Sequence, residues 1–321
     1  MNNKIKIALI GCGNWGKNIA RNLYEMDCLA CIYDPNSLQA KEFISSHKLP
    51  IYSLNEIFLN EEITAVVIAT SARTHKEIAI QALKNNKDVF IEKPFSLSLS
   101  DANLISKLAI TKNKILMVGH LLNYHNSFLE LKKVIKEGKI GSIKNIRAQR
   151  LALGSIRNYE SVLYDLTVHD ISMILSITQA LPLKALAHSI HHNSNVGPDA
   201  VSVTLYFKDG ITAVLNSDWM CPYKEHRFSV IGTKGSLIFD DTKNWDSKLS
   251  LNQSSINPDN TIDLKNTKNL TVKQNEPLKI ELESFLSSIK SRKNPVTNHT
   301  EALNVQIVME MIQDNLKKNK A

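Results

Sequence analysis

The chain has 321 residues, of which 43% are hydrophobic and 22% charged, and its formal net charge is +8 at pH 7. This length exceeds one average domain, and the ordinary globular composition excludes a small disulfide-bonded scaffold. The longest apolar stretch, 65–69, is far too short to cross a bilayer, and the N-terminus lacks a signal-peptide pattern, so we expect a cytoplasmic protein without a membrane partner.

Up to residue 122, strand and helix patterns alternate about every 20 to 30 residues, which predicts parallel strands joined by crossover helices. The expected strands are 4–10, 29–33, 65–69, 88–91 and 115–118, and the expected helices are 17–25, 37–46, 74–85 and one after residue 100. We therefore predict an α/β Rossmann domain, with a doubly wound parallel sheet that binds the cofactor, over residues 1–122.

From residue 123 onward the pattern changes to strands joined by turns. Helices are expected at 127–137 and 165–178, and hairpins at 200–207 with 211–217 and at 227–231 with 236–239. The polar segment 241–272 is interpreted as irregular surface structure, and amphipathic helices at 277–290 and 300–317 close the chain. Residues 123–321 are thus predicted to form an α+β domain with an open, mostly antiparallel sheet. We expect this domain to bind the substrate and to assemble the chain into a homodimer or homotetramer.

Cysteine and histidine spacing predicts no metal site. The chain has four cysteines, few for its length and typical of a reducing compartment: Cys12, Cys28, Cys31 and Cys221. The Cys28–Cys31 spacing matches a ligand pair, but no second pair lies nearby, so we interpret both as core residues. His191 and His192 also lack a carboxylate or cysteine at ligand spacing.

A glycine-rich turn directly follows the first predicted strand and opens the first helix: Gly11-Cys12-Gly13-Asn14-Trp15-Gly16. Its glycines permit a tight turn and a close approach to a diphosphate, which the amides at the helix N-terminus stabilise. Asp34 ends the second strand, where a carboxylate accepts hydrogen bonds from the adenosine ribose and repels a 2′-phosphate. We therefore predict NAD rather than NADP, bound by Gly11, Gly13, Asn14, Trp15, Gly16 and Asp34. A glycine turn without a ligand is the alternative.

Hydroxyl side chains follow the third predicted strand, in Thr70-Ser71-Ala72-Arg73-Thr74-His75. Ligands lie at the carboxyl edge of a parallel sheet, so we expect Thr70, Ser71 and His75 to contact the cofactor. A cap on the following helix is an alternative role for Ser71 or Thr74, and it is compatible with the first.

Two further motifs carry candidate catalytic groups. The fourth strand ends in Ile91-Glu92-Lys93-Pro94, where the Lys93–Pro94 bond is a candidate for the cis isomer. Asp165 and His169 stand four residues apart at the start of a predicted helix, a spacing that places them on one face. Taken alone, a surface lysine before a turn proline and a helix cap with a hydrogen-bonded histidine are the ordinary interpretations.

A Rossmann unit with Glu-Lys-Pro at the end of its fourth strand, followed by an Asp-x-x-x-His pair, resembles the Gfo/Idh/MocA oxidoreductases. The resemblance implies that Lys93 lies between nicotinamide and substrate, where it stabilises developing alkoxide charge, with Glu92 beside the cofactor. It also implies that His169 is the general base and that Asp165 orients the sugar or the histidine.

Within this family the chain is similar to the branch acting on UDP-N-acetylglucosaminuronate, through the segments 119–125, 153–157, 169–172 and 218–224. This similarity implies oxidation of the C3 hydroxyl of a nucleotide sugar, as in polysaccharide biosynthesis, with Asn123, Arg157 and Lys224 as further substrate contacts. Asn123, Asn126 and Val168 depart from the pattern of the branch, and these departures concern the sugar rather than the redox chemistry.

Other functions remain open at this point. A reductase of NDP-3-keto-sugars and an inositol or free-sugar dehydrogenase belong to the same family, and a silent NAD-binding regulatory protein belongs to another class. The basic charge raises nucleic-acid binding, but the lysines are scattered rather than clustered with aromatic residues, so we expect no nucleic-acid partner.

Overall fold

The computed structural model describes residues 4–36, 38–154, 160–191, 197–256, 259 and 261–318. The chain divides into two compact units. The first contains the residues up to Leu121 together with Pro277–Gln306, and the second contains Leu122–Glu276 together with the residues from Ile307. This division differs from the expected one in the segment Pro277–Gln306, which packs with the first unit rather than the second. The cofactor and substrate roles expected of the two units remain predictions.

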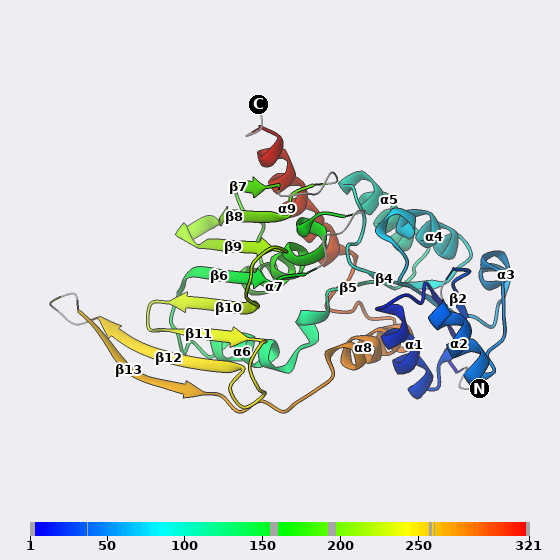
Figure 1. Ribbon diagram of the computed structural model, residues 1–321, viewed down its shortest axis with the longest axis horizontal. Helices are drawn as coiled ribbons and strands as arrows, with labels where there is room; N and C mark the ends of the chain where they lie inside the picture. Colours follow the sequence, from blue (N-terminus) through cyan, green and yellow to red (C-terminus); the bar gives the residue numbers. More distant parts are fainter. Residues whose placement is uncertain are drawn as a thin grey trace. The chain divides into compact units, whose positions relative to one another are not determined.

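Five parallel strands form the sheet of the first unit, in the order β2-β1-β3-β4-β5 (Figure 1). They are β1 (Ile7–Ile10), β2 (Leu29–Tyr33), β3 (Ala65–Ile68), β4 (Asp88–Glu92) and β5 (Leu116–Gly119). Most of their side chains are buried, which explains their unbroken apolar sequences, because helices cover both faces of such a sheet. The predicted doubly wound α/β fold is confirmed.

The helices of the first unit are α1 (Gly16–Glu25), α2 (Leu38–His47), α3 (Leu54–Leu59), α4 (Ala72–Lys84), α5 (Leu99–Thr111), α8 (Pro277–Ser291) and the start of α9 (His299–Lys318). Helices α3, α4 and α5 share one core with alternate residues of the strands. Outside that core, Phe285 of α8 packs edge-on against Phe90 of β4, and this burial holds α8 in the first unit. Helix α3 is absent from the sequence-based prediction, although Ser53 and Glu56 form a capping box at its start.

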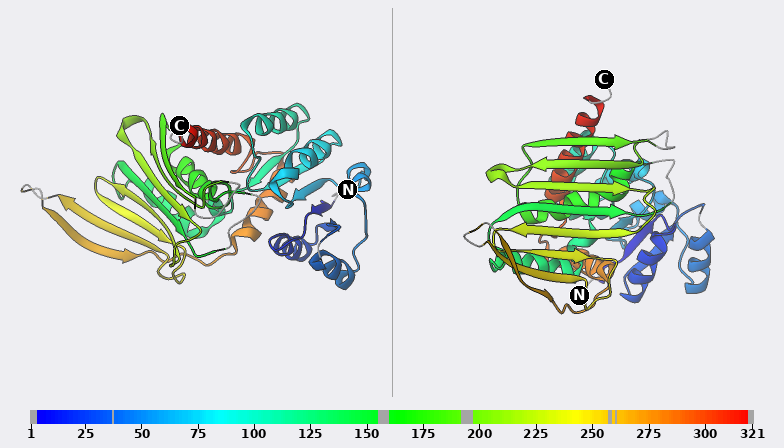
Figure 2. Two further views of the ribbon diagram at one scale, coloured as in Figure 1. Left: turned by 45° about the horizontal axis from the view of Figure 1, so that its top comes forward. Right: turned by 60° about the vertical axis from the view of Figure 1, so that its left-hand side comes forward.

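An eight-stranded sheet forms the second unit, in the order β13-β12-β11-β10-β6-β9-β8-β7. All neighbours are antiparallel except β6 and β9, which are parallel. The strands are β6 (Ile143–Leu151), β7 (Lys184–Ile190), β8 (Ala200–Tyr206), β9 (Thr212–Asp218), β10 (Glu225–Gly232), β11 (Gly235–Asp240), β12 (Leu249–Ile256) and β13 (Ile262–Asn269). Figure 2 shows this sheet face-on in its right-hand view. The expected open, mostly antiparallel sheet and both expected hairpins are confirmed.

Helices cover one face of this sheet: α6 (Asn126–Lys136), α7 (Val168–Thr178) and the end of α9. Phe128 of α6 packs against Phe228 of β10, and Asn315 of α9 accepts a hydrogen bond from the Ala187 amide of β7. Short helical turns, η1 (Leu121–Tyr124), η2 (Leu163–Thr167) and η3 (Lys208–Gly210), join the larger elements. None of the described helices is both long and apolar enough to span a bilayer.

The polar segment that we interpreted as irregular is instead largely a β-hairpin. Strand β12 pairs with β11 and β13 pairs with β12, so two strands extend the sheet edge. Leu249 of β12 is fully buried, whereas several other side chains of the two strands are exposed to solvent. The hydrophobic alternation that identifies a strand therefore fades along this hairpin, because much of it has no core to face.

The four cysteines are buried and unpaired by disulfides, as expected of core residues. Burial raises the pKa of the Cys28 thiol to about 11 and that of the Cys31 thiol to about 12. Both groups are thus thiols rather than thiolates at neutral pH, and the thiolate is the form that binds metal.

Candidate active site

The glycine turn lies where the strand order of the first sheet reverses, between β1 and β3, which is the place where open α/β sheets bind ligands. Gly11 has a φ of 95°, and a Cβ there would lie 2.6 Å from the Ala69 carbonyl carbon after β3. A Cβ on Gly16 would lie 2.5 Å from the Gly11 oxygen. A Cβ on Gly13, in contrast, would meet no atom within 4 Å. The packing of the chain itself requires glycine at positions 11 and 16, whereas Gly13 leaves open the space that a diphosphate would fill.

Asp34 stands immediately after β2 and beside this turn. Its Oδ2 accepts a hydrogen bond of 2.8 Å from the Cys12 amide, and its Oδ1 accepts one of 3.1 Å from the Asn36 amide. These two bonds hold the carboxylate in place beside the glycine turn. The glycine turn and Asp34 therefore fit an NAD diphosphate and adenosine ribose, and Asn14 is exposed on the same turn.

The residues after β3 are tied to each other and to the loop after β4. Ser71 is the N-cap residue of α4, but its side chain makes no capping hydrogen bond, and the Thr74 hydroxyl donates to the Thr70 hydroxyl at 2.8 Å. The His75 ring is 1% exposed, with Nδ1 2.9 Å from the Pro94 oxygen and Nε2 3.1 Å from the Thr70 oxygen. Burial lowers the pKa of His75, and the ring bridges the two loops. Cofactor contacts by Thr70, Ser71 and His75 remain predictions.

Lys93 is half-buried at the carboxyl end of β4, and its peptide bond to Pro94 is cis, as expected. The preceding Glu92 accepts hydrogen bonds from the Trp15 indole nitrogen at 2.9 Å and from the Lys93 amide at 3.2 Å. Gly119 of β5 lies against this carboxylate, and a Cβ there would come within 3.0 Å of it. Glu92 thus connects the glycine turn to Lys93, while the Trp15 side chain stays 43% exposed on the turn.

Asp165 and His169 lie at the junction of η2 and α7 in the second unit. The expected α-helix begins here as a π-turn, in which the Val168 amide bonds to the Leu163 oxygen. Such turns occur frequently at functional sites. The Asp165 carboxylate accepts a hydrogen bond of 3.0 Å from the buried Trp219 indole, and His169 is half-buried one turn later.

The other predicted substrate contacts have distinct environments. Asn123 is buried in η1 and donates a hydrogen bond of 2.7 Å to the Ser172 hydroxyl of α7, one turn beyond His169. Lys224 is exposed just before β10. Arg157 lies outside the described residues.

Comparison with known proteins relates both parts of the chain to one family. Residues 5–120 match the model of an oxidoreductase family with an NAD-binding Rossmann fold, and residues 128–238 match that of the GFO/IDH/MocA C-terminal domain. The chain belongs to the Gfo/Idh/MocA family of oxidoreductases. The family resemblance of the sequence is therefore confirmed. As a Gfo/Idh/MocA protein the chain is an oxidoreductase with NAD as its cofactor.

Three relatives show the range of this Gfo/Idh/MocA family. The chain is 28% identical over 255 residues to 2,7-anhydro-N-acetylneuraminate hydratase of Escherichia coli, covering 74% of this chain and 68% of that protein. It is 28% identical over 256 residues to myo-inositol 2-dehydrogenase of Thermotoga maritima, covering 74% and 76%. The structure of UDP-N-acetylglucosamine 3-dehydrogenase from Acidithiobacillus ferrooxidans matches with a TM-score of 0.86 at 20% identity, over 98% of both chains. Their names differ in substrate, so membership leaves the substrate open.

An ion pair that the sequence analysis missed anchors the start of α7, next to His169, to strand β6. Arg150 of β6 holds the neighbouring Asp170 through Nε at 3.2 Å and Nη2 at 2.8 Å, and Asp170 is 2% exposed. Both residues are visible in the sequence, but no local spacing connects a strand residue to a helix residue 20 positions away.

We expect Arg150→Met to lower the free energy of unfolding by about 3–5 kcal/mol, because the buried Asp170 carboxylate loses the guanidinium that neutralises its charge. The double variant Arg150→Met/Asp170→Asn removes the stranded charge and is expected to recover part of this loss. Urea denaturation of the three proteins measures the effect. Equal stabilities of the single and double variants would contradict the assigned role of the pair.

Proposed function

We propose that this protein oxidises a secondary hydroxyl of a sugar, with Lys93 and His169 acting on the hydroxyl group. The observation that carries the proposal is the position of Lys93 at the carboxyl end of β4, joined through Glu92 to the glycine turn. The glycine turn and Asp34 would hold NAD, whose nicotinamide would supply the acceptor for the hydride that leaves the carbinol carbon. A ring nitrogen of His169 takes the hydroxyl proton as the C=O bond forms, and the Lys93 ammonium stabilises the negative charge that develops on that oxygen.

Asp165 is proposed to orient the substrate or His169. Its hydrogen bond from Trp219 fixes the carboxylate against rotation, and the π-turn at η2 keeps Asp165 and His169 about one turn apart. A group that is held in advance loses less freedom when the substrate binds, and this supports turnover.

For the substrate we propose a nucleotide sugar, with the C3 hydroxyl of a UDP-N-acetylhexosaminuronate or a similar NDP-sugar as the reacting group. The four sequence segments shared with that branch support this choice. The net charge of +8 and the exposed Lys224 also favour an anionic ligand. The product would be a 3-keto sugar, which an aminotransferase can convert to an amine during polysaccharide biosynthesis.

An inositol or free-sugar dehydrogenase is the second candidate, because myo-inositol 2-dehydrogenase is among the relatives at 28% identity. A panel of UDP-N-acetylglucosaminuronate, UDP-N-acetylglucosamine, myo-inositol and glucose, each with NAD, separates the two. NADH absorbance together with a mass loss of two units in one UDP-sugar supports the first candidate. Oxidation of inositol or glucose alone supports the second, and no oxidation of any of them contradicts both.

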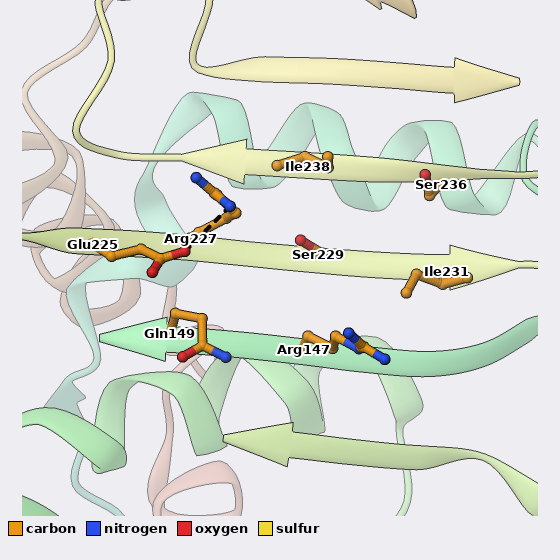
Figure 3. A pocket seen from close by; sticks show the side chains of 8 residues that line it. All are labelled: Arg147, Gln149, Glu225, Arg227, Ser229, Ile231, Ser236 and Ile238. Atoms are coloured by element: carbon orange, nitrogen blue, oxygen red, sulfur yellow. Dashed lines mark ion pairs between the residues drawn. The ribbon is translucent and has the colours of Figure 1, made fainter. Parts of the chain in front are cut away.

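We also propose that the exposed face of the second sheet joins copies of this chain into a homodimer or homotetramer. Figure 3 shows side chains of three adjacent strands along this face, which surround a shallow depression: Arg147, Gln149, Glu225, Arg227, Ser229, Ile231, Ser236 and Ile238. Only two of these are aliphatic, so the face suits a partly polar contact. Sedimentation equilibrium of the protein and of Ile231→Glu tests this assembly, and a monomeric parent protein would exclude it.

A further inference from the structure

A buried carboxyl group of the first unit has no role in the proposed reaction. Glu281 projects from α8 and is 1% exposed. Its Oε1 has no access to solvent and no hydrogen-bond partner among the described residues. Ionised carboxylates are rarely left in this condition, because removing the charge from water costs several kcal/mol unless other groups compensate.

The groups that face Glu281 make ionisation still less favourable. Two other carboxyl groups act on it electrostatically: Glu92 at the end of β4 and Glu301 of α9. Glu301 is engaged by His120, whose Nδ1 lies 2.7 Å from its carboxylate, while the His120 Nε2 is buried without a partner. Lys93 and His120 act on Glu92 rather than on Glu281. The cluster thus contains three carboxyl groups, and only two of them have neighbours that stabilise a negative charge.

Hydrogen bonding determines which carboxyl group of the Glu92–Glu281 pair retains a proton. Burial raises the pKa of Glu92 as well, but the hydrogen bonds from the Trp15 indole and the Lys93 amide oppose this rise and favour its ionised form. Oε1 of Glu281 has no such donor in the part of the chain that the structure describes. Burial, then Glu92 and Glu301, raises the pKa of Glu281 well above its ordinary value. Two buried carboxyl groups that repel each other behave as a coupled pair, in which ionisation of one opposes ionisation of the other.

We propose that Glu281 is a positioning residue of the Lys93 site, which holds the proton of this pair and thereby keeps Glu92 ionised in its bonds to Trp15 and Lys93. The proposal rests on the proposed function of Lys93. With a proton on Glu281, α8 packs in the first unit without adding a second negative charge that would repel Glu92. When Glu281 loses its proton at high pH, repulsion between the two carboxylates moves Glu92 off its donors and loosens the turn that holds NAD.

The proton on Glu281 is tested on the protein alone, without NAD or substrate. A carboxyl group whose pKa is raised on folding contributes stability that is present below its unfolded pKa and is lost as the pH rises through its folded pKa. Glu281→Gln cannot titrate at this position. The melting temperature of the variant minus that of the parent protein should therefore increase by about 2 °C or more as the pH rises from about 5 to about 8. The control is Glu283→Gln, an exposed position on the same helix. A pH-independent difference for Glu281→Gln would overturn the proposal.

The link to the Lys93 site is tested by NAD binding across the same pH range. We expect NAD affinity of the parent protein to fall by at least about 3-fold between pH 6 and pH 9, which is about 0.7 kcal/mol. The affinity of Glu281→Gln should stay constant, because an amide replaces the acid without acquiring charge. Glu281→Ala provides a second variant, which loses side-chain volume and should weaken NAD binding at every pH. A parallel pH profile for the parent protein and Glu281→Gln would overturn the positioning role.

These measurements separate two kinds of failure. If Lys93→Ala retains full turnover, the proposed function is wrong, whatever the state of Glu281. If the melting temperatures and NAD affinities of Glu281→Gln follow the parent protein at each pH, the inference about Glu281 is wrong while the proposed function stands.

Discussion

Lys93→Ala is expected to lower the turnover number for substrate oxidation by about 10²- to 10⁴-fold, which is the usual loss of rate when an electrostatic or acid–base group is removed. The dissociation constant for NAD should change by less than about 3-fold, because the glycine turn and Asp34 supply the proposed contacts to the diphosphate and ribose. Steady-state NADH formation and isothermal titration with NAD measure the two effects. His169→Ala should produce a loss of similar size, since the hydroxyl proton then has no base to accept it.

The controls are a lysine and a histidine outside both candidate sites. Lys107 is exposed on α5 and His188 is exposed on β7, so their alanine variants should keep the turnover of the parent protein. If Lys93 and His169 act on one hydroxyl group, the double alanine variant should be little worse than the poorer single variant, because residues that act as a unit are not additive. Unaltered turnover of either single variant would remove its assigned role.

Gly13→Ala should weaken NAD binding by about 10- to 100-fold without lowering the melting temperature. A Cβ at this position meets no protein atom within 4 Å, so the folded chain accepts it. The added methyl group instead occupies the space that the diphosphate requires, and a clash of this kind costs about 1–3 kcal/mol. Titration calorimetry with NAD and a thermal melt of the same sample distinguish binding from folding.

Gly11→Ala is the matched comparison, because it adds the same methyl group two residues away. There φ is 95° and the Cβ would lie 2.6 Å from the Ala69 carbonyl carbon, so the backbone must move. We expect a loss of at least about 2 kcal/mol in the free energy of unfolding, together with loss of NAD binding. If Gly13→Ala bound NAD as tightly as the parent protein, the turn would not be the diphosphate site.

The sequence predicted the first unit well because its signals are local. The strands β1 to β5 are short apolar runs, and helices α1, α4 and α5 follow them at regular spacing. The glycine turn was recognisable because it falls between a strand and a helix. Helix α3 was missed although its capping box was readable, since a six-residue helix carries little hydrophobic periodicity.

Features that depend on distant partners were not predictable in the same way. Strands β12 and β13 are identified by pairing to the sheet edge rather than by their own alternation. The Arg150–Asp170 pair joins a strand to a helix, and the π-turn at η2 replaces a regular helical start. In the first two cases the deciding contact joins separate elements, whereas the π-turn depends on the nearby bond from the Val168 amide to the Leu163 oxygen, which no residue pattern marked.

The sequence by itself determined the family, the doubly wound fold and the cofactor, because a strand, a glycine turn and Glu-Lys-Pro act through backbone geometry and spacing along the chain. Only the tertiary structure decided that helix α8 belongs to the first unit and that its Glu281 is buried among other carboxyl groups. From the sequence alone, a glutamate on an amphipathic helix is predicted to face solvent. Whether it keeps its proton depends on how much water and how many charges surround it after folding, and those surroundings come from parts of the chain up to about 190 residues away.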